Sequence, residues 1–304
     1  MPQLFTTLGP KTADELGFIL PHEHVFVDLR TPDRPGYAEA DTDEVVRVMA
    51  PRIAEIKAEG VTALVECTTG GVGRRADIDL AVSEATDFPI VVPTGNYREP
   101  WIPDWVRIAS EADLEAWMTR ELNERLGEAD FKAGWIKLSA GDDGITELET
   151  RILRAAVRAA KRCNATIGSH TIKGRVVMDQ LDIIEREGGD PSRFISIHTQ
   201  AEPDFELHKA VAARGAWIEF DNAGWVPDED YLKPVLHALD AGLERQMLLS
   251  HDAGWYDPAK PHGGEQKPYT VLAGSILPAL RQRGVGAETI RLLTHANPFN
   301  AFAR

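Results

Sequence analysis

Short apolar runs recur along the chain at fairly even intervals, and each leads through Gly, Asn, Asp or Thr into a longer amphipathic segment. We count eight such runs, at residues 18–29, 62–70, 90–97, 134–141, 165–171, 194–200, 217–224 and 247–254. The segments between them, such as residues 149–163 and 174–188, carry apolar residues at helical spacing. The pattern therefore predicts eight strands that alternate with helices.

This alternation decides the fold class. Continuous apolar strands that alternate with helices imply parallel pairing and a sheet covered by helices. Eight units favour an α/β fold of the closed (β/α)8 or TIM-barrel type, and no Gly-rich dinucleotide fingerprint follows the first strand. Residues 4–20 predict a short N-terminal hairpin that plugs the barrel's N-terminal end. No linker divides the chain, so we expect residues 1–304 to form a single domain.

The composition and charge of the chain limit the classes of partner that it can bind. Hydrophobic residues make up 43% of the chain and charged residues 27%, which is typical of a globular protein with a sizeable core. The formal net charge of −15 disfavours nucleic acid and anionic membranes as partners. Cys67 and Cys163 stand apart and indicate neither a disulfide framework nor a cysteine zinc site. The chain shows no signal-peptide pattern and no apolar stretch of ~18 residues, so we expect a cytoplasmic protein.

Ligand-type side chains gather at the ends of the predicted strands. His22 and His24 in PHEH point to the same face of the first strand while Glu23 points away. That pair alone is equally consistent with histidines that bind no metal. Further candidates fall at the ends of the fourth, fifth, sixth and eighth strands, where barrel active sites are built. The predicted ligands of a metal centre are His22, His24, Lys137, His170, His198 and Asp252.

Two of these residues have alternatives. A neutral Lys137 amine can react with carbon dioxide to give a carbamate whose two oxygens bridge two metals, but the lysine can also extend out of the barrel mouth into solvent. Only one of His251 and Asp252 can face inward. We choose Asp252, which can also act as general base, over a His251 ligand with Asp252 capping the next turn. His262 in the last long loop is a further candidate for substrate contact.

Several longer motifs extend over essentially the whole chain: TTLGP, GFILPHEH, GWIKLSAG, IGSHT, GGDPSRFISIHT, AARGAWIEFD, LLSHDAG and LLTHANPFNAFA. In these motifs the chain resembles the phosphotriesterase family of the amidohydrolase superfamily, which contains phosphotriesterases and phosphotriesterase-like lactonases. The resemblance implies that His22, His24 and Asp252 bind a more buried cation and that His170 and His198 bind a more exposed one. A carboxylated Lys137 and a hydroxide then bridge the two divalent metal ions. Zn²⁺ suits these ligands best, and Mn²⁺ or Co²⁺ fits the same geometry.

The same resemblance bears on the substrate. In the lactonases a tyrosine after the third strand lies near the metals, and Tyr97 is similar to it, although an aromatic that packs at the barrel rim remains an alternative. Ala201 and Asn222 stand where the phosphotriesterases carry an aspartate and a histidine of a proton relay, although Asp221 is kept. This departure argues against organophosphate triesters. The expected substrate contacts are Tyr97, Trp255, Lys267 and Tyr269.

The sequence thus predicts a binuclear hydrolase of a small polar lactone or carboxylic ester, in which the bridging hydroxide attacks the carbonyl and Asp252 takes the proton. A phosphoric-ester or amide hydrolase on the same metals and an inactive ligand-binding barrel stay open. A redox enzyme with one iron is disfavoured because it leaves Lys137 and a second histidine pair unexplained. The expected partner is a small molecule, and the loop near Trp101 and Trp105 is a candidate homodimer interface.

Overall fold

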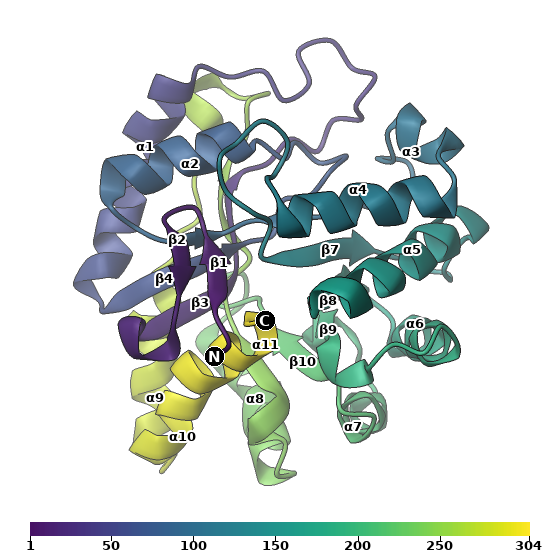
Figure 1. Ribbon diagram of the computed structural model, residues 1–304. Helices are drawn as coiled ribbons and strands as arrows, with labels where there is room; N and C mark the ends of the chain where they lie inside the picture. The colour runs from purple at the N-terminus through teal and green to yellow at the C-terminus, as the bar shows by residue number, and fades with distance from the viewer.

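The computed structural model describes residues 1–304 and contains the alternating strands and helices that the apolar pattern predicts (Figure 1). Each of the eight predicted strands is present. The third is divided at Val92, and the eighth resumes after a break at residues 250–252. The strands are β3 (Phe18–Phe26), β4 (Val61–Glu66), β5 (Ile90–Val91) with β6 (Pro93–Thr94), β7 (Trp135–Ser139), β8 (Ile167–His170), β9 (Phe194–Ile197), β10 (Trp217–Phe220), and β11 (Met247–Leu249) with β12 (Ala253–Tyr256).

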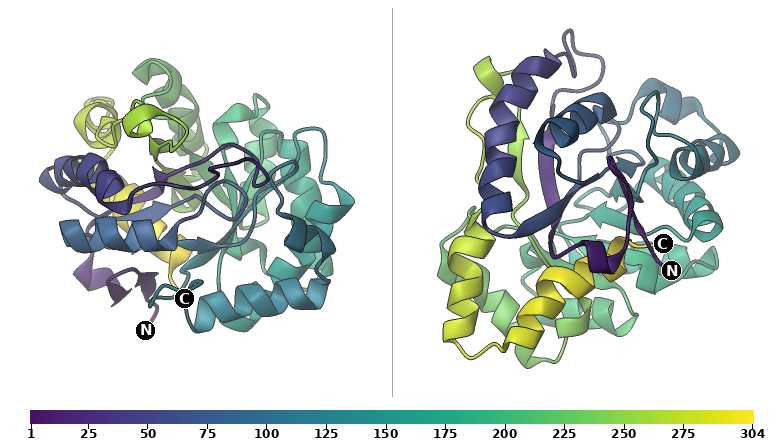
Figure 2. Two further views of the ribbon diagram at one scale, coloured as in Figure 1. Left: turned by 90° about the horizontal axis from the view of Figure 1, so that it is seen from above. Right: turned by 60° about the vertical axis from the view of Figure 1, so that its left-hand side comes forward.

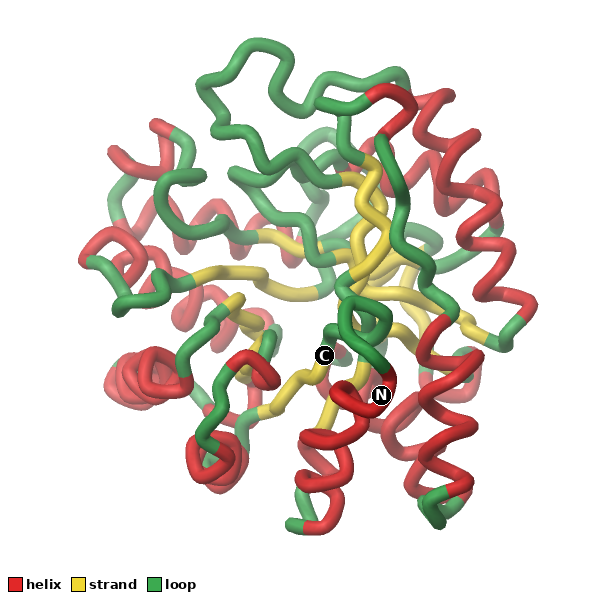
Figure 3. The backbone as a smooth tube through the Cα atoms, turned by 180° about the vertical axis from the view of Figure 1, so that it is seen from behind, coloured by secondary structure: helices red, strands yellow, loops and turns green.

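The strands follow one another around the sheet in chain order. They pair in parallel in two ladders, β6-β7-β8-β9-β10-β11 and β12-β3-β4-β5. The ladders adjoin where only Val92 separates β5 from β6. On the other side, the Asp252 amide donates to the His22 carbonyl at 3.1 Å. This order is that of a TIM barrel, and Figures 2 and 3 show the strands at the centre of the molecule with helices around them.

Amphipathic helices cover the strands. The helices are α1 (Thr42–Ala58), α2 (Ala76–Thr86), α3 (Asp104–Ile108), α4 (Glu111–Asn123), α5 (Glu147–Cys163), α6 (Gly174–Arg186), α7 (Phe205–Ala213), α8 (Asp228–Asp240), α9 (Leu277–Gln282), α10 (Ala287–Arg291) and α11 (Asn297–Phe302), with π-helical turns at Leu272–Ile276 and Leu292–Ala296 and 3₁₀ turns at Ala13–Glu15, Pro191–Arg193, Thr199–Ala201, Glu244–Gln246 and Pro261–Gly263. The two helices predicted at 149–163 and 174–188 are confirmed as α5 and α6. None of the helices combines the length and the hydropathy that a membrane span requires.

Two buried clusters hold the fold together. The larger one, of 59 residues, lies between strands and helices, and a separate cluster of 14 residues includes Ala63, Val65 and Cys67, which alternate along β4 and its end. Leu4 and Phe302 belong to this second cluster, so both chain ends help to fill the barrel. Leu4 comes from the predicted hairpin, which is present as β1 (Leu4–Thr6) paired antiparallel with β2 (Gly9–Lys11). Figure 1 shows the two termini side by side at this end of the barrel.

Long connections lie at the opposite end of the barrel. One of them, between β6 and α4, contains α3, and another, between β11 and the π-helical turn Leu272–Ile276, contains β12 and the 3₁₀ turn Pro261–Gly263. A third, between β3 and α1, was not apparent from the sequence and forms the purple loop at the top of Figure 1. It is anchored by the buried carboxylate of Asp28, which accepts hydrogen bonds from the Arg30 guanidinium at 2.6 Å and the Ala38 amide at 2.8 Å.

Candidate metal centre

A pocket of about 260 Å³ opens where the barrel strands end. All six residues expected as metal ligands line it, although they come from five different strands or strand ends. The lining residues are His22, His24, Val27, Leu29, Cys67, Val72, Tyr97, Lys137, His170, His198, Asp252 and Trp255. The convergence arises because parallel strands place their C-terminal ends at one face of a barrel.

The first group of ligand-type atoms joins β3 to the break between β11 and β12. His22, His24 and Asp252 offer atoms that lie within 4.8 Å of one another. Asp252 Oδ1 is 3.0 Å from His24 Nε2 and 3.6 Å from His22 Nε2. Two imidazoles and one carboxylate at such separations are suited to hold one divalent cation.

The structure also separates Asp252 from its neighbour His251. The His251 imidazole is fully buried, with Nδ1 2.5 Å from Glu23 Oε1, and its Nε2 accepts a hydrogen bond from the Leu272 amide at 2.9 Å. Both ring nitrogens are therefore occupied by groups that do not line the pocket. Of the two alternatives, Asp252 is the residue that faces the candidate ligands.

A second pair of histidines lies across the pocket from Asp252. His170 ends β8 and His198 follows β9, with His198 Nε2 2.7 Å from His170 Nδ1. Asp252 Oδ1 is buried, and its polar contacts are with His24 Nε2 and His22 Nε2. The nitrogens that His170 and His198 direct at each other, and the Asp252 carboxylate that faces two imidazoles, are electron-pair donors for which bound cations would be suitable partners. The donor set therefore fits divalent metal ions.

Lys137 on β7 lies on the floor of the pocket. Its side chain is only 2% exposed, and its Nζ lies 5.8 Å from the Trp135 ring in the cluster beneath. The lysine therefore does not extend into solvent, which was the alternative for this residue. A buried ammonium beside cations would be repelled, whereas a carboxylated lysine would be an anion suited to two of them.

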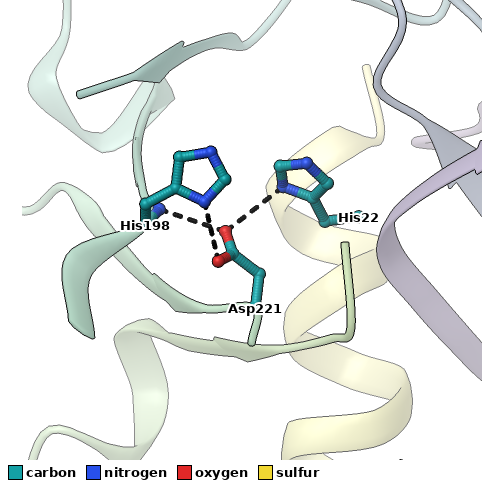
Figure 4. Close-up of side chains that lie close together, drawn as sticks. All are labelled: His22, His198 and Asp221. Carbon is teal, nitrogen blue, oxygen red and sulfur yellow. Dashed lines mark hydrogen bonds and ion pairs between the residues drawn. The ribbon is translucent and has the colours of Figure 1, made fainter. Parts of the chain in front are cut away.

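The far nitrogens of three ligand-type imidazoles contact fixed acceptors. The pairs are His22 Nδ1 with Glu219 Oε1 at 2.5 Å, His24 Nδ1 with Thr68 Oγ1 at 2.7 Å, and His198 Nδ1 with Asp221 Oδ1 at 2.8 Å. Figure 4 shows His22 and His198 on either side of Asp221. Such partners fix which ring nitrogen faces the pocket. Sequence reasoning had not assigned this role to Glu219, Asp221 or Thr68; the two-residue spacing of Glu219 and Asp221 on β10 was the available signal.

The Asp221 carboxylate also has a second hydrogen-bond partner. Its Oδ1 accepts a hydrogen bond from Gln200 Nε2 at 2.6 Å in addition to the contact with His198. Its Oδ2 lies 3.3 Å from His22 Nδ1. The carboxylate therefore holds His198 and Gln200 in place and also contacts the imidazole of His22.

Burial and nearby charges shift the pKa values of neighbouring groups of the pocket in different directions. Burial, together with the positive charge of Lys137, lowers the pKa of His22 to about 3. Burial also opposes protonation of His24, but Asp252 and Glu66 outweigh it and raise the pKa of His24 to about 9. Burial and the nearby Asp221 raise the pKa of Glu219 well above its usual range. A cation bound at His24 Nε2 would take the place of the proton shared there with Asp252.

The expected substrate contacts divide into two sets. Tyr97 and Trp255 line the pocket, with the Tyr97 hydroxyl 3.1 Å from His170 Nδ1. Burial raises the pKa of Tyr97 far above its usual value, so its phenol is a hydrogen-bond donor. Tyr269 is buried outside the pocket and donates to the His24 carbonyl at 2.7 Å, and the Lys267 Nζ lies 4.7 Å from the Trp225 ring.

Residues other than Lys267 and Tyr269 complete the lining of the pocket. His262 is 85% exposed, pairs with Glu44 and does not line the pocket. Val27 and Leu29 from the β3–α1 loop, with Val72 and Cys67, form walls that no sequence pattern had indicated. Apart from the six candidate ligands, the side chains that line the pocket are therefore largely apolar.

Comparisons with known proteins agree over the whole chain. The model of the Phosphotriesterase family matches residues 2–302. A phosphotriesterase homology protein of Mycobacterium tuberculosis is 33% identical over 324 residues, which cover 100% of this chain and 98% of the relative. The solved structure of the phosphotriesterase from Mycobacterium tuberculosis has a TM-score of 0.89 at 31% identity and covers 99% of this chain and 98% of that one. A mutant of a phosphotriesterase-like lactonase from Deinococcus radiodurans has a TM-score of 0.89 at 28% identity and covers 98% and 99%.

Proposed function

The chain belongs to the phosphotriesterase family, and from this premise we propose that it is a binuclear metal-dependent hydrolase of a small lactone or carboxylic ester. The observation that carries the proposal is the gathering of six ligand-type side chains in one pocket, where Asp252 Oδ1 faces His22 and His24 and His170 Nδ1 faces His198 Nε2. The proposed ligands are His22, His24 and Asp252 for one cation and His170 and His198 for the other, with carboxylated Lys137 shared. Two divalent cations, with zinc as the first choice, would supply a water ionised near neutral pH and a Lewis acid for the carbonyl oxygen.

The protein's own groups do the remaining work. The Asp252 carboxylate accepts the proton of the attacking water and passes it to the leaving alkoxide. Tyr97, whose hydroxyl lies beside His170, donates a hydrogen bond to the substrate oxygen on which negative charge develops. The contacts of Glu219, Thr68 and Asp221 hold the imidazoles in the tautomers that face the pocket.

The walls of the pocket support the choice of an acyl substrate. Val27, Leu29 and Val72 offer hydrocarbon surface beside the candidate ligands, and the pocket volume of about 260 Å³ suits a small molecule. The lactonase name of the Deinococcus radiodurans protein points in the same direction. A phosphotriester hydrolase is the second candidate, because the Mycobacterium tuberculosis structure is named a phosphotriesterase.

The test is turnover of matched substrates by zinc-loaded protein. Proton release is followed with a γ-lactone, a δ-lactone, an aryl dialkyl phosphate and an anilide, for the wild type, Asp252→Asn and the control Asp257→Asn. Asp257 lies in the same loop but pairs with Lys260 outside the pocket. We expect a lactone to be the best substrate and Asp252→Asn to reduce its turnover about 10²–10⁴-fold, as for loss of a general base.

Each other result has a definite meaning. A phosphate triester that is turned over faster than both lactones would replace the proposed substrate with the second candidate. Full lactone turnover by Asp252→Asn would remove the aspartate from the reaction. Metal uptake without turnover of any substrate would return the chain to the class of ligand-binding barrels.

A further inference from the structure

The backbone of Asp252 adopts a conformation that its residue type disfavours. Its φ is 54°, in the left-handed region, at the point where β11 breaks and β12 begins. Aspartate is one of the few residues other than glycine that enter this region, and it does so at some energetic cost because its Cβ then crowds the following carbonyl. The direction of the Asp252 carboxylate therefore depends on what fixes this peptide.

Two tryptophans from different elements donate hydrogen bonds to the Asp252 carbonyl. Trp225, in the loop between β10 and α8, donates its indole N–H to the Asp252 carbonyl at 3.1 Å and to the His251 carbonyl at 2.8 Å. Trp255, on β12, donates to the same Asp252 carbonyl at 2.9 Å. The two rings pack edge to face, with centroids 5.9 Å apart. One carbonyl oxygen thus uses both of its lone pairs on indole donors.

The amide groups of Asp252 and of its two neighbours donate hydrogen bonds to residues of β3. Its own N–H donates to the His22 carbonyl, on the strand that carries the partner ligands. The carboxylate of Glu23 accepts hydrogen bonds from the His251 amide at 3.3 Å and the Ala253 amide at 3.0 Å. Glu23 therefore fixes the residues on either side of Asp252, and the indoles fix Asp252 itself.

Release of the carbonyl would allow the peptide to return to extended backbone. A change of φ away from 54° would rotate the Cα–Cβ bond of Asp252, so the carboxylate would then leave the position it holds opposite His24. Trp255 has a second link to this position, because its ring lies edge to face with His24 at 5.3 Å. Trp225 is in turn covered by the Lys267 ammonium.

We propose that Trp225 and Trp255 are positioning residues for the metal site: their indole N–H groups hold Asp252 in the left-handed conformation that directs its carboxylate at the cation shared with His22 and His24. The inference rests on the proposed role of Asp252 as a ligand. It also assigns a use to Lys267, which stabilises Trp225 instead of reaching the pocket.

The test is titration of the metal-free full-length chain with Co²⁺ alone, followed by visible absorption, which reports the ligand geometry of the bound ion. The variants are Trp225→Phe, Trp255→Phe and the double variant, since phenylalanine keeps a ring but has no N–H. The matched control is Trp217→Phe, which loses an indole bond to the Ser192 carbonyl at 3.1 Å far from the pocket. We expect the double variant to bind Co²⁺ about 10–100-fold more weakly with an altered spectrum, as for loss of outer contacts to a ligand. The control should stay within about twofold of the wild type.

Wild-type affinity and spectrum in the double variant, or an equal loss of affinity in Trp217→Phe, would overturn the inference while leaving the proposed function intact. A wild-type chain that binds no Co²⁺ would overturn both. Should the double variant fail to fold, Trp225→Phe decides alone, because Trp255 then still packs against His24 and any weakening comes from the lost donor.

Discussion

Tyr97 and His170 form the contact through which a single hydroxyl influences the proposed reaction. The Tyr97 hydroxyl is 3.1 Å from His170 Nδ1, and the ring packs edge to face on the imidazole with centroids 5.2 Å apart. Removal of the hydroxyl alone leaves this packing in place. The residue therefore offers a clean separation of hydrogen bonding from shape.

Replacement of Tyr97 by phenylalanine should lower kcat/KM for the best lactone by up to about tenfold, the equivalent of one hydrogen bond of ~0.5–1.5 kcal/mol. Metal content should not change, because no proposed ligand is altered. The measurement is steady-state kinetics with metal analysis of the same sample, and Tyr37→Phe, whose hydroxyl accepts from the Gly73 amide, is the control. Unchanged kinetics in Tyr97→Phe would support the alternative of a rim aromatic.

Among single residues, the six candidate ligands and two of the four expected substrate contacts, Tyr97 and Trp255, line one pocket, whereas Lys267 and Tyr269 do not. His22, His24 and Lys137 could be placed because strand periodicity fixes which residues face the barrel interior. Lys267 and Tyr269 could not, because their positions depend on a backbone bridge between Gly254 and Lys267 that brings the last loop back against β12. Tertiary pairing of this kind leaves no local pattern in the sequence.

Among the elements, the β3–α1 loop carries two walls of the pocket and depends on one buried carboxylate. Burial alone would raise the pKa of Asp28, but hydrogen bonds from the Arg30 side chain and from the Ala38 and Arg30 amides outweigh it and lower this pKa. A carboxyl whose pKa is lower in the folded protein adds stability above its unfolded pKa of ~3.9, and this stability is lost as the pH falls further.

Asp28→Asn should therefore reduce the free energy of unfolding at pH 7 by about 1–3 kcal/mol, the effect of removing a charged partner from buried hydrogen bonds. The difference from the wild type should begin to shrink as the pH falls below about 4, where the unfolded chain takes up the proton, and it should vanish once the pH falls below the lowered pKa of the native carboxyl. Denaturant unfolding at both pH values measures this, and Asp43→Asn, an exposed change at the start of α1, should have little effect. A difference that stays constant with pH would contradict the assigned pKa shift.

Helix α5 begins with a capping interaction between Thr146 and Glu149, which are three residues apart. The Thr146 hydroxyl accepts from the Glu149 amide at 3.2 Å while the Glu149 carboxylate accepts from the Thr146 amide at 3.0 Å. Thr146→Ala should reduce the free energy of unfolding by about 1 kcal/mol, and Thr146→Ser should stay close to the wild type because it keeps the capping oxygen. Equal losses in the two variants on denaturant unfolding would show that the methyl group and not the cap is responsible.

The elements themselves were predictable where their patterns are local. Apolar runs predicted all eight strands, and helical spacing predicted α5 and α6. The division of the third strand at Val92 and the long β3–α1 loop were not predictable, because both depend on contacts with distant residues. The Gly73 amide, for example, is held by the Tyr37 hydroxyl across that loop.

For the whole molecule, the proposed cations join strands that are far apart in sequence, from β3 to β11. A ligand that binds only the folded state stabilises it by ~2.7 kcal/mol at a hundred times its dissociation constant. Removal of metal with a strong chelator should therefore lower the Tm by about 5–10 °C, given the few degrees per kcal/mol of a chain this long. The control is the same chelator already saturated with zinc, and an unchanged Tm after verified metal removal would contradict a site that links the strands.

The metal content per chain of zinc-reconstituted protein shows whether Lys137 and the five other proposed ligands hold two divalent cations. The wild type is compared with Lys137→Ala and with Lys173→Ala, a lysine that pairs with Asp143 outside the pocket. We expect close to two zinc ions per chain in the wild type and in Lys173→Ala, and one or fewer in Lys137→Ala. One ion or none in the wild type, or two retained by Lys137→Ala, would contradict this expectation.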